Sequence, residues 1–166
     1  MKTLIIYYSS SGSTKIMAKT LSMHLKADII EIKDLKNREG FLNRIVSSVD
    51  AFRESKTKIS PPKIDLSNYD LIYIGTPTWA NKPAPAIITL IDNCDWQGKD
   101  VILFTTMTKE GSDEITLNRL EEKVYLRGGR VVESFSLITK NKSPENIIND
   151  TEGLIQTLVL KMYSGV

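Results

Sequence analysis

The sequence predicts an α/β fold of three layers, in which a doubly wound parallel sheet of five strands lies between two layers of helices. Short apolar runs rich in β-branched residues alternate along the chain with segments that repeat apolar residues at helical spacing. Three of these runs are apolar enough to be strands buried on both faces, as in a parallel sheet. Right-handed crossovers then place helices on both sides of the sheet, and the expected strand order is 2-1-3-4-5.

Each element is predicted from its own segment. The strands are expected at "TLIIYY" (3–8), "DIIEI" (28–32), "DLIYIG" (70–75), "DVILFTT" (100–106) and "RVVESFSL" (130–137). The helices are expected from apolar residues at helical spacing, which are Met17, Leu21 and Leu25; Leu42, Ile45, Val46, Val49 and Phe52; a short segment after Pro85; Leu117, Leu120 and Val124; and Ile147, Ile148, Thr151, Ile155, Leu158 and Met162.

Two helix boundaries carry clear signals. Ser143 is placed to cap the last helix, Pro144 fits its first position, and Glu145 complements the helix dipole. Gly128 and Gly129 are expected to end the preceding helix, because glycine readily adopts the left-handed conformation found there.

Length and composition favour one domain, 1–166, in an ordinary globular protein. The stretch 53–68 is predicted as a surface loop rather than a domain boundary, and its basic residues as solvated. A net charge of +2 is too small to favour nucleic acid. Cys94 has no internal disulfide partner, and the apolar start is too short for a signal peptide or membrane insertion, so we expect a cytoplasmic protein.

Ligands of such sheets bind at the carboxyl ends of the strands, where the chain reverses direction across the sheet. The loops expected there are 9–14, 76–83 and 107–113. The first loop joins a strand directly to a helix and contains Ser9, Ser10, Ser11, Gly12, Ser13 and Thr14. Its backbone N–H groups and hydroxyls predict a phosphate site built from neutral donors. Turn formation and helix capping alone remain the alternative.

Several other phosphate-binding classes do not fit. The loop has one glycine, so it matches neither the nucleoside-triphosphatase pattern nor the three-glycine dinucleotide fingerprint. It has no thiol for a cysteine phosphatase, since Cys94 lies far downstream. A response-regulator receiver would have acidic residues where this chain has Ser9 and Gly75. The loop therefore favours phosphate binding without phosphate chemistry.

The sequence Ser9-x-Ser11-Gly12-x-Thr14 matches the [ST]-x-[ST]-G-x-[ST] phosphate loop of flavodoxins and flavodoxin-like FMN proteins. "YDLIYIGTPTWANKPAPAI" (69–87) resembles the third strand and FMN-contacting loop of that family. "GKDVILFTTMT" and "GFLNRIVSSVDAFRESK" are also similar, so the resemblance covers nearly the whole chain, in a short-chain form. It implies a flavodoxin-like fold with FMN at the switch point of the sheet.

The resemblance also implies roles for individual residues. The phosphate would be held by Ser9, Ser10, Ser11, Gly12, Ser13 and Thr14, and the ring would be contacted by Pro77, Thr78, Trp79, Ala80, Asn81, Thr106, Met107 and Thr108. An indole offers a large apolar surface for stacking, so Trp79 is expected beside the flavin. Trp96 is expected in the core and His24 on the surface, and no metal site or catalytic side chain is predicted.

Two departures from the family leave the activity open. Residues 105–116 lack the second aromatic with which many flavodoxins cover the other flavin face, and Lys82 and Lys109 lie in the loops, where electron carriers are commonly acidic. The first reading is an electron carrier that docks with redox partner proteins. The alternative is an NAD(P)H-dependent reductase of quinones or similar acceptors, and a more distant one is a binding module that has lost its flavin.

Overall fold

The computed structural model describes residues 1–36 and 56–164, without the side chains of residues 162–164. The strands are β1 (Thr3–Tyr7), β2 (Asp28–Glu31), β3 (Lys33–Asp34), β4 (Ile59–Ser60), β5 (Leu71–Trp79), β6 (Lys82–Pro83), β7 (Asp100–Met107) and β8 (Arg130–Ile138). The helices are α1 (Ser13–Leu25), α3 (Pro85–Asn93), α4 (Asp113–Leu126) and α5 (Pro144–Ser164). The predicted helix around Leu42–Phe52 lies outside the described residues.

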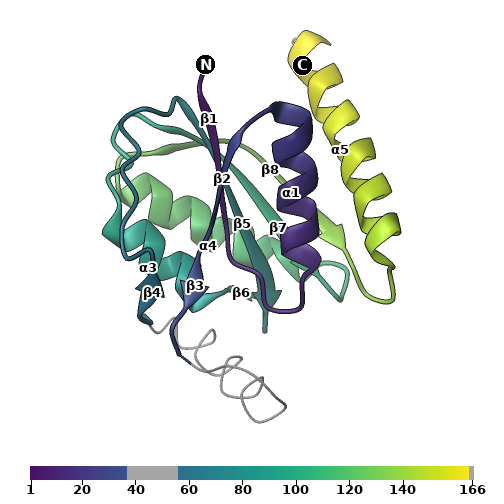
Figure 1. Cartoon of the computed structure of the whole chain (residues 1–166), viewed down its shortest axis with the longest axis horizontal. Coiled ribbons are helices and arrows are strands. Elements are labelled where there is room, and N and C mark those ends of the chain that lie inside the picture. The colour runs from purple at the N-terminus through teal and green to yellow at the C-terminus, as the bar shows by residue number, and fades with distance from the viewer. Residues whose placement is uncertain (37–55, 165–166) are drawn as a thin grey trace.

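The central sheet has the order β2-β1-β5-β7-β8, and all four neighbouring pairs are parallel. This confirms the predicted 2-1-3-4-5 order of the five main strands. Helices α1 and α5 cover one face of the sheet, and α3 and α4 cover the other (Figure 1). The predicted three-layer α/β architecture is therefore confirmed.

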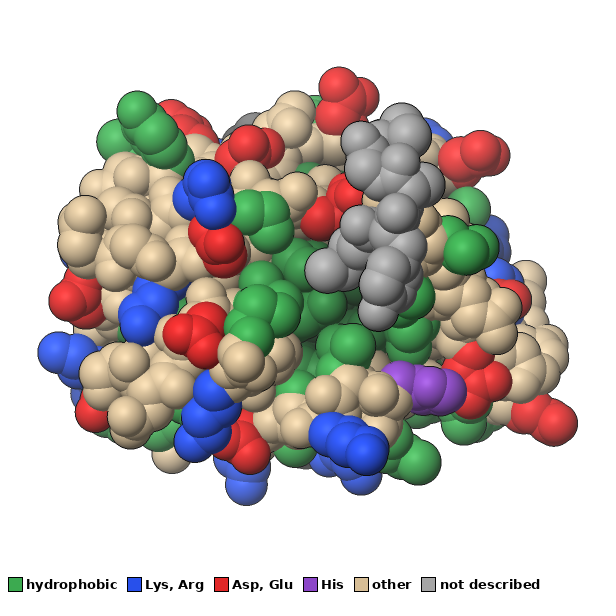
Figure 2. Space-filling view, turned by 90° about the horizontal axis from the view of Figure 1, so that it is seen from above, with side chains coloured by type: hydrophobic (Ala, Val, Ile, Leu, Met, Phe, Trp, Pro, Cys, Tyr) green, Lys and Arg blue, Asp and Glu red, His purple; other side chains and the backbone are tan. Residues whose placement is uncertain are grey.

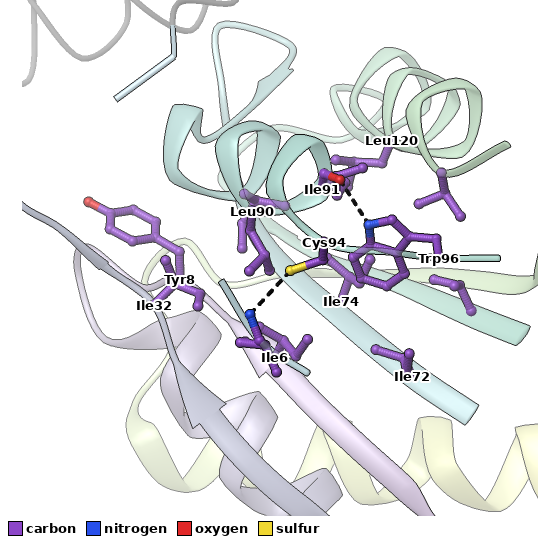
Figure 3. Close-up of a cluster of buried hydrophobic side chains, with 14 of the residues drawn as sticks. Ile6, Tyr8, Ile32, Ile72, Ile74, Leu90, Ile91, Cys94, Trp96 and Leu120 are labelled. Atoms are coloured by element: carbon purple, nitrogen blue, oxygen red, sulfur yellow. Dashed lines mark hydrogen bonds between the residues drawn. The ribbon is translucent and has the colours of Figure 1, made fainter. Parts of the chain in front are cut away.

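Alternation along the strands builds two cores, one on each face. On β7, Val101 and Leu103 join the core under α3 and α4, whereas Ile102 and Phe104 join the core under α1 and α5. Trp96 is fully buried in the first core, where its Nε1–H donates to the Ile91 carbonyl at 2.9 Å (Figure 3). The predicted packing role of Trp96 is thus confirmed.

Gly75, near the middle of the sheet, allows the second core to close. A Cβ atom built at Gly75 would lie 2.2 Å from Cζ of Phe104, far inside van der Waals contact. The Phe104 ring in turn stacks on Phe135, with ring centroids 5.9 Å apart. The aromatic side chain of β7 therefore occupies the space that glycine leaves free on β5.

The predicted loop 76–83 is wrong, because β5 continues to Trp79 and returns through β6 as a short hairpin. The ladder with β7 extends through Thr76 and Pro77, beyond the last contact of β5 with β1 at Gly75. Pro77 thus has a strand neighbour on one side only, where a proline is tolerated. The proline and threonines concealed this extension in the sequence.

The prediction of a surface loop at 53–68 holds only in part for the described residues 56–68, most of which are exposed and lie outside helices and strands. This segment forms β4, which pairs with β3, and it buries Ile59, Ile64 and Leu66 in the core under α3 and α4. Residues 53–55 lie outside the described part. The burial of three apolar residues was not predicted, because the segment is rich in prolines and lysines.

The two predicted helix boundaries are confirmed. The Ser143 hydroxyl accepts the Asn146 N–H at 3.2 Å at the start of α5, and α4 ends at Leu126, just before Gly128 with φ of 87°. Within residues 1–36 and 56–164, no helix is long and apolar enough to cross a membrane.

Candidate functional site

Loops gather where the central strands end, which is the edge at which α1 begins (Figure 1). Three contacts join them: Thr14 to Thr106, Tyr8 to Trp79, and Thr78 to Thr105. The structure therefore brings together parts of the three loops that the sequence predicts at the site.

The opposite end of the sheet has different chemistry. Figure 2 views this end, where apolar side chains gather near the centre among charged residues of both signs. A cavity of about 370 Å³ is lined here by Leu71, Tyr73, Ile102, Val132 and Leu158, among others. The cluster of hydroxyl side chains belongs to the other end, where the strands finish.

The first loop leaves its backbone donors open. Gly12 has φ of 102°, and its carbonyl accepts the N–H of Ile16 to begin α1. The Ser9 hydroxyl accepts the Lys15 N–H at 3.2 Å, so Ser9 also caps the helix. Across residues 1–36 and 56–164, no acceptor is found for the N–H groups of residues 10–14. A run of unsatisfied amides at a helix N-terminus is a site for an anion.

The lysine nearest this loop is already paired. The Lys15 amine lies 3.0 Å from a Glu31 carboxylate oxygen at the end of β2. Burial raises the pKa of the neighbouring Tyr7 phenol to about 12, and the negative charge of Glu31 adds to the shift. The Lys15 charge is therefore balanced within the protein, and the loop offers mainly neutral donors.

Thr14 is buried, with 1% of its surface exposed, and its Oγ1 lies 2.8 Å from Oγ1 of Thr106. Thr106 follows Ile102 and Phe104 on the same face of β7, so its side chain points to the α1 side of the sheet. This hydrogen bond ties the phosphate-type loop to the end of β7.

The second loop is the hairpin between β5 and β6. Trp79 pairs with Lys82, and the two turn residues, Ala80 and Asn81, have φ of 48° and 61°. Two successive residues in the left-handed conformation define a type I′ turn. Alanine rarely adopts this conformation, because its Cβ atom makes it unfavourable. Such an outlier is typical of binding sites.

Trp79 is half-buried and contacts both Tyr8 and the protein core. Its indole meets the Tyr8 ring edge-on, with centroids 5.6 Å apart and planes at 88°. It also packs against the core under α3 and α4. Tyr8 was not among the predicted site residues, and its position directly before Ser9 was the available signal.

Threonines hold the hairpin from within. The Thr105 hydroxyl donates to the Thr76 carbonyl at 2.7 Å, and the Thr76 hydroxyl accepts the Ala84 N–H at 2.9 Å. Oγ1 of Thr78 lies 2.9 Å from that of Thr105 and 3.1 Å from that of Thr116 on α4. The Thr78 hydroxyl therefore points into the protein rather than toward a ligand.

The third loop is short and follows β7. Met107 is buried, with 7% of its surface exposed, and its carbonyl accepts the Thr139 N–H at 2.8 Å. Thr108 and Lys109 are exposed, and the Ser112 hydroxyl donates to the Lys109 carbonyl. Of the three third-loop residues predicted at the site, only Thr108 is exposed at the surface.

His24 lies on α1, with Nε2 3.0 Å from a carboxylate oxygen of Glu152 on α5. It is exposed, which confirms the prediction of a surface residue. The described residues contain no group of three or more His, Cys, Asp or Glu side chains placed to hold a metal ion.

Comparison with known proteins identifies this arrangement. The profile of the family described as "Flavodoxin" matches residues 2–142, most of the chain. The chain belongs to the flavodoxin family.

Solved structures give the same result for this flavodoxin. A Bacteroides uniformis protein assigned as a flavoprotein superposes with a TM-score of 0.75 at 26% identity, covering 91% of this chain and 97% of the other. A Lactobacillus acidophilus flavoprotein in complex with FMN superposes with a TM-score of 0.66 at 29% identity, covering 81% and 92%.

A relative of known type comes from Cupriavidus metallidurans, an NAD(P)H dehydrogenase (quinone) that is 27% identical over 124 residues. The match covers 70% of this flavodoxin and 62% of the relative, so it spans less than two thirds of that protein.

The residues present fit a phosphate monoester at the first loop. Unsatisfied amides line the loop, and a Cβ placed on Gly12 would meet nothing within 4 Å, so a group can approach the backbone closely. Hydroxyls of neighbouring serines add further donors without a net positive charge.

Proposed function

We propose that this protein binds FMN at the edge formed by its first loop, its β5–β6 hairpin and its third loop, and that it acts in electron transfer. The observation that carries the proposal is that the amides of residues 10–14, at the start of a helix beside serine hydroxyls, have no acceptor among residues 1–36 and 56–164. Family membership and the FMN complex of the Lactobacillus acidophilus neighbour support the choice of cofactor.

Each loop has a distinct role in the proposal. Residues Ser10–Thr14 donate to the phosphate, while the Ser9 hydroxyl accepts the Lys15 N–H and can still donate its own proton to the phosphate. Trp79 provides a flat apolar surface for the ring, and the hairpin residues Pro77, Ala80 and Asn81 shape the edge beside it. Thr78 supports the hairpin through hydrogen bonds to Thr105 and Thr116 inside the protein.

Bound FMN supplies exchange of hydride or single electrons, and the protein supplies position and surroundings. The edge-on contact with Tyr8 restricts the indole of Trp79, which gives the ring a preorganised surface. Chain 1–166 would work as one domain that exchanges electrons with redox partner proteins or with NAD(P)H.

A reductase of quinones or similar acceptors is the second candidate, and two observations favour it. Residues 105–116 contain no aromatic side chain, so this loop supplies no ring that would cover the second face of the flavin and exclude a flat acceptor. The Cupriavidus metallidurans relative is an NAD(P)H dehydrogenase (quinone).

The two candidates are separated by adding NADH or NADPH to the FMN-reconstituted protein without oxygen and following the visible spectrum. Rapid bleaching by a nicotinamide would establish the reductase. Bound flavin that ignores both nicotinamides, but is reduced by dithionite and passes electrons to a carrier protein, would support the electron carrier. Absence of any FMN binding would overturn both candidates.

A further inference from the structure

Thr14 and Thr106 form a buried pair of hydroxyls beside the first loop. Their oxygens lie 2.8 Å apart, and the residues are 1% and 4% exposed. Thr14 lies at the start of α1 and Thr106 near the end of β7, 92 positions apart in the chain.

The hydroxyl pair has one more donor than its own hydrogen bond uses. Each hydroxyl carries one proton, and the bond between the two oxygens uses one of them. Among residues 1–36 and 56–164, neither hydroxyl has a second acceptor. One O–H donor is therefore left in a place nearly closed to water, where an unsatisfied donor is costly.

The position of Thr14 shows where that proton can go. Its own N–H is one of the unsatisfied amides at the start of α1, next to the open backbone at Gly12. An anion held by these amides would offer an acceptor to the Thr14 hydroxyl. Its oxygen can then receive the proton of Thr106, and two hydrogen bonds in series strengthen each other.

We propose that Thr106 is a positioning residue for phosphate recognition: it donates to Oγ1 of Thr14 and so directs the Thr14 hydroxyl toward the phosphate. This rests on the proposed binding of FMN. It moves Thr106 from the flavin ring, where the family resemblance predicts it, to the phosphate end of the site. It also makes the end of β7 part of the phosphate site without any contact with the ligand.

The test compares FMN with riboflavin, which has the same ring but no phosphate. Thr106→Val keeps the shape of the side chain and removes its hydroxyl. We expect the affinity for FMN to fall roughly three- to tenfold, while the affinity for riboflavin stays unchanged. Thr106→Ser restores the hydroxyl and should restore the FMN affinity. In a Thr14→Val background, Thr106→Val should cause no further loss.

Thr116→Val is the matched control, since it removes a buried threonine hydroxyl on the other face of the sheet. It should leave the ratio of FMN to riboflavin affinity unchanged. If Thr106→Val does not fold, Thr106→Ala is compared with Thr106→Ser, because these two variants differ only in the hydroxyl.

Three results would overturn the proposal. Equal weakening of FMN and riboflavin would mean that Thr106 acts by shape or at the ring. An unchanged FMN affinity would mean that its hydroxyl has no role, and full additivity with Thr14→Val would mean that the two act separately. If the unmodified protein binds neither flavin, the proposed function itself fails. This outcome is distinguishable from the three above, because it is measured without any substitution.

Discussion

The first loop and the β5–β6 hairpin use their hydrogen-bonding groups in opposite ways. In the first loop, the amides of residues 10–14 have no acceptor in the described protein. In the hairpin, the Thr76 hydroxyl accepts the Ala84 N–H, and the Thr78 hydroxyl is hydrogen-bonded to that of Thr105 on β7. The first loop thus has donors that a ligand can use, whereas the hydrogen-bonding groups of the hairpin are used within the protein.

This difference follows from the local structure. A helix N-terminus leaves amides without intrahelical acceptors, so a short loop of serines and glycine at this place can bind an anion. A two-residue turn with Ala80 and Asn81 in left-handed conformation is strained, and it needs the threonine network and the Tyr8–Trp79 contact to persist. Polarity of a residue in a binding loop therefore does not show whether its side chain faces the ligand.

The largest expected effect is a loss of stability from a substitution in the sheet that supports both regions. Gly75→Ala places a Cβ 2.2 Å from the Phe104 ring, beneath the point where the loops meet. We expect the free energy of unfolding to fall by about 2–3 kcal/mol, measured by urea denaturation.

Gly153→Ala is the control for this change. Gly153 is exposed in the middle of α5, and an added Cβ meets nothing within 4 Å. This variant should be more stable by about 0.5–1 kcal/mol, since alanine favours helix. A Gly75→Ala variant as stable as the unmodified protein would contradict the packing described for Phe104.

The next effect isolates the hairpin surface. Trp79→Ala removes the indole and should weaken FMN and riboflavin equally, by about 1–2 kcal/mol, because stacking acts on the shared ring. The measurement is a flavin titration followed by tryptophan emission, in which quenching of the Trp79 component should disappear. Selective loss of FMN affinity would place Trp79 at the phosphate instead.

A smaller effect tests the internal role of the hairpin hydroxyls. Thr78→Val removes the partner of Thr105 and Thr116 without changing shape. Thermal or urea unfolding should show a loss of about 1–2 kcal/mol, while the relative affinity for FMN and riboflavin stays constant. A change in that ratio with unchanged stability would mean that the Thr78 hydroxyl faces the ligand.

The smallest effect concerns the charges beside the first loop. The Tyr7 pKa is raised from 10.0 to about 12, so folding favours the neutral phenol. Its contribution to stability is present below pH 10 and is lost as the pH rises toward 12. Tyr7→Phe should remove that part of the decline, measured as the difference in unfolding free energy between the two proteins across this range. An identical decline in both proteins would contradict the assignment to Tyr7.

Much of the fold follows from the sequence, because apolar runs and helical spacing report which residues reach a core. The strand order and the caps at Ser143 and Gly128 are examples. The extension of β5 could not be predicted, since Thr76 and Thr78 are polar yet belong to a ladder. The buried residues of segment 56–68 were similarly concealed among prolines and lysines.

The site divides in the same way. The hydroxyl-rich loop and Trp79 are visible as motifs, because their residue types are unusual at the end of a strand. The pairing of Thr14 with Thr106 and the inward direction of Thr78 depend on contacts between residues far apart in the chain. Tyr8 and Thr116 have ordinary residue types for their elements, so only the structure relates them to the site.

The account depends most on the claim that the first loop holds the phosphate of FMN. The most direct measurement is the affinity of the unmodified protein for FMN and for riboflavin, with inorganic phosphate as a competitor. The account predicts that FMN binds at least about tenfold more tightly than riboflavin, a difference of about 1.4 kcal/mol, and that phosphate reduces only the binding of FMN. Equal affinity for the two flavins, or binding unaffected by phosphate, would contradict it.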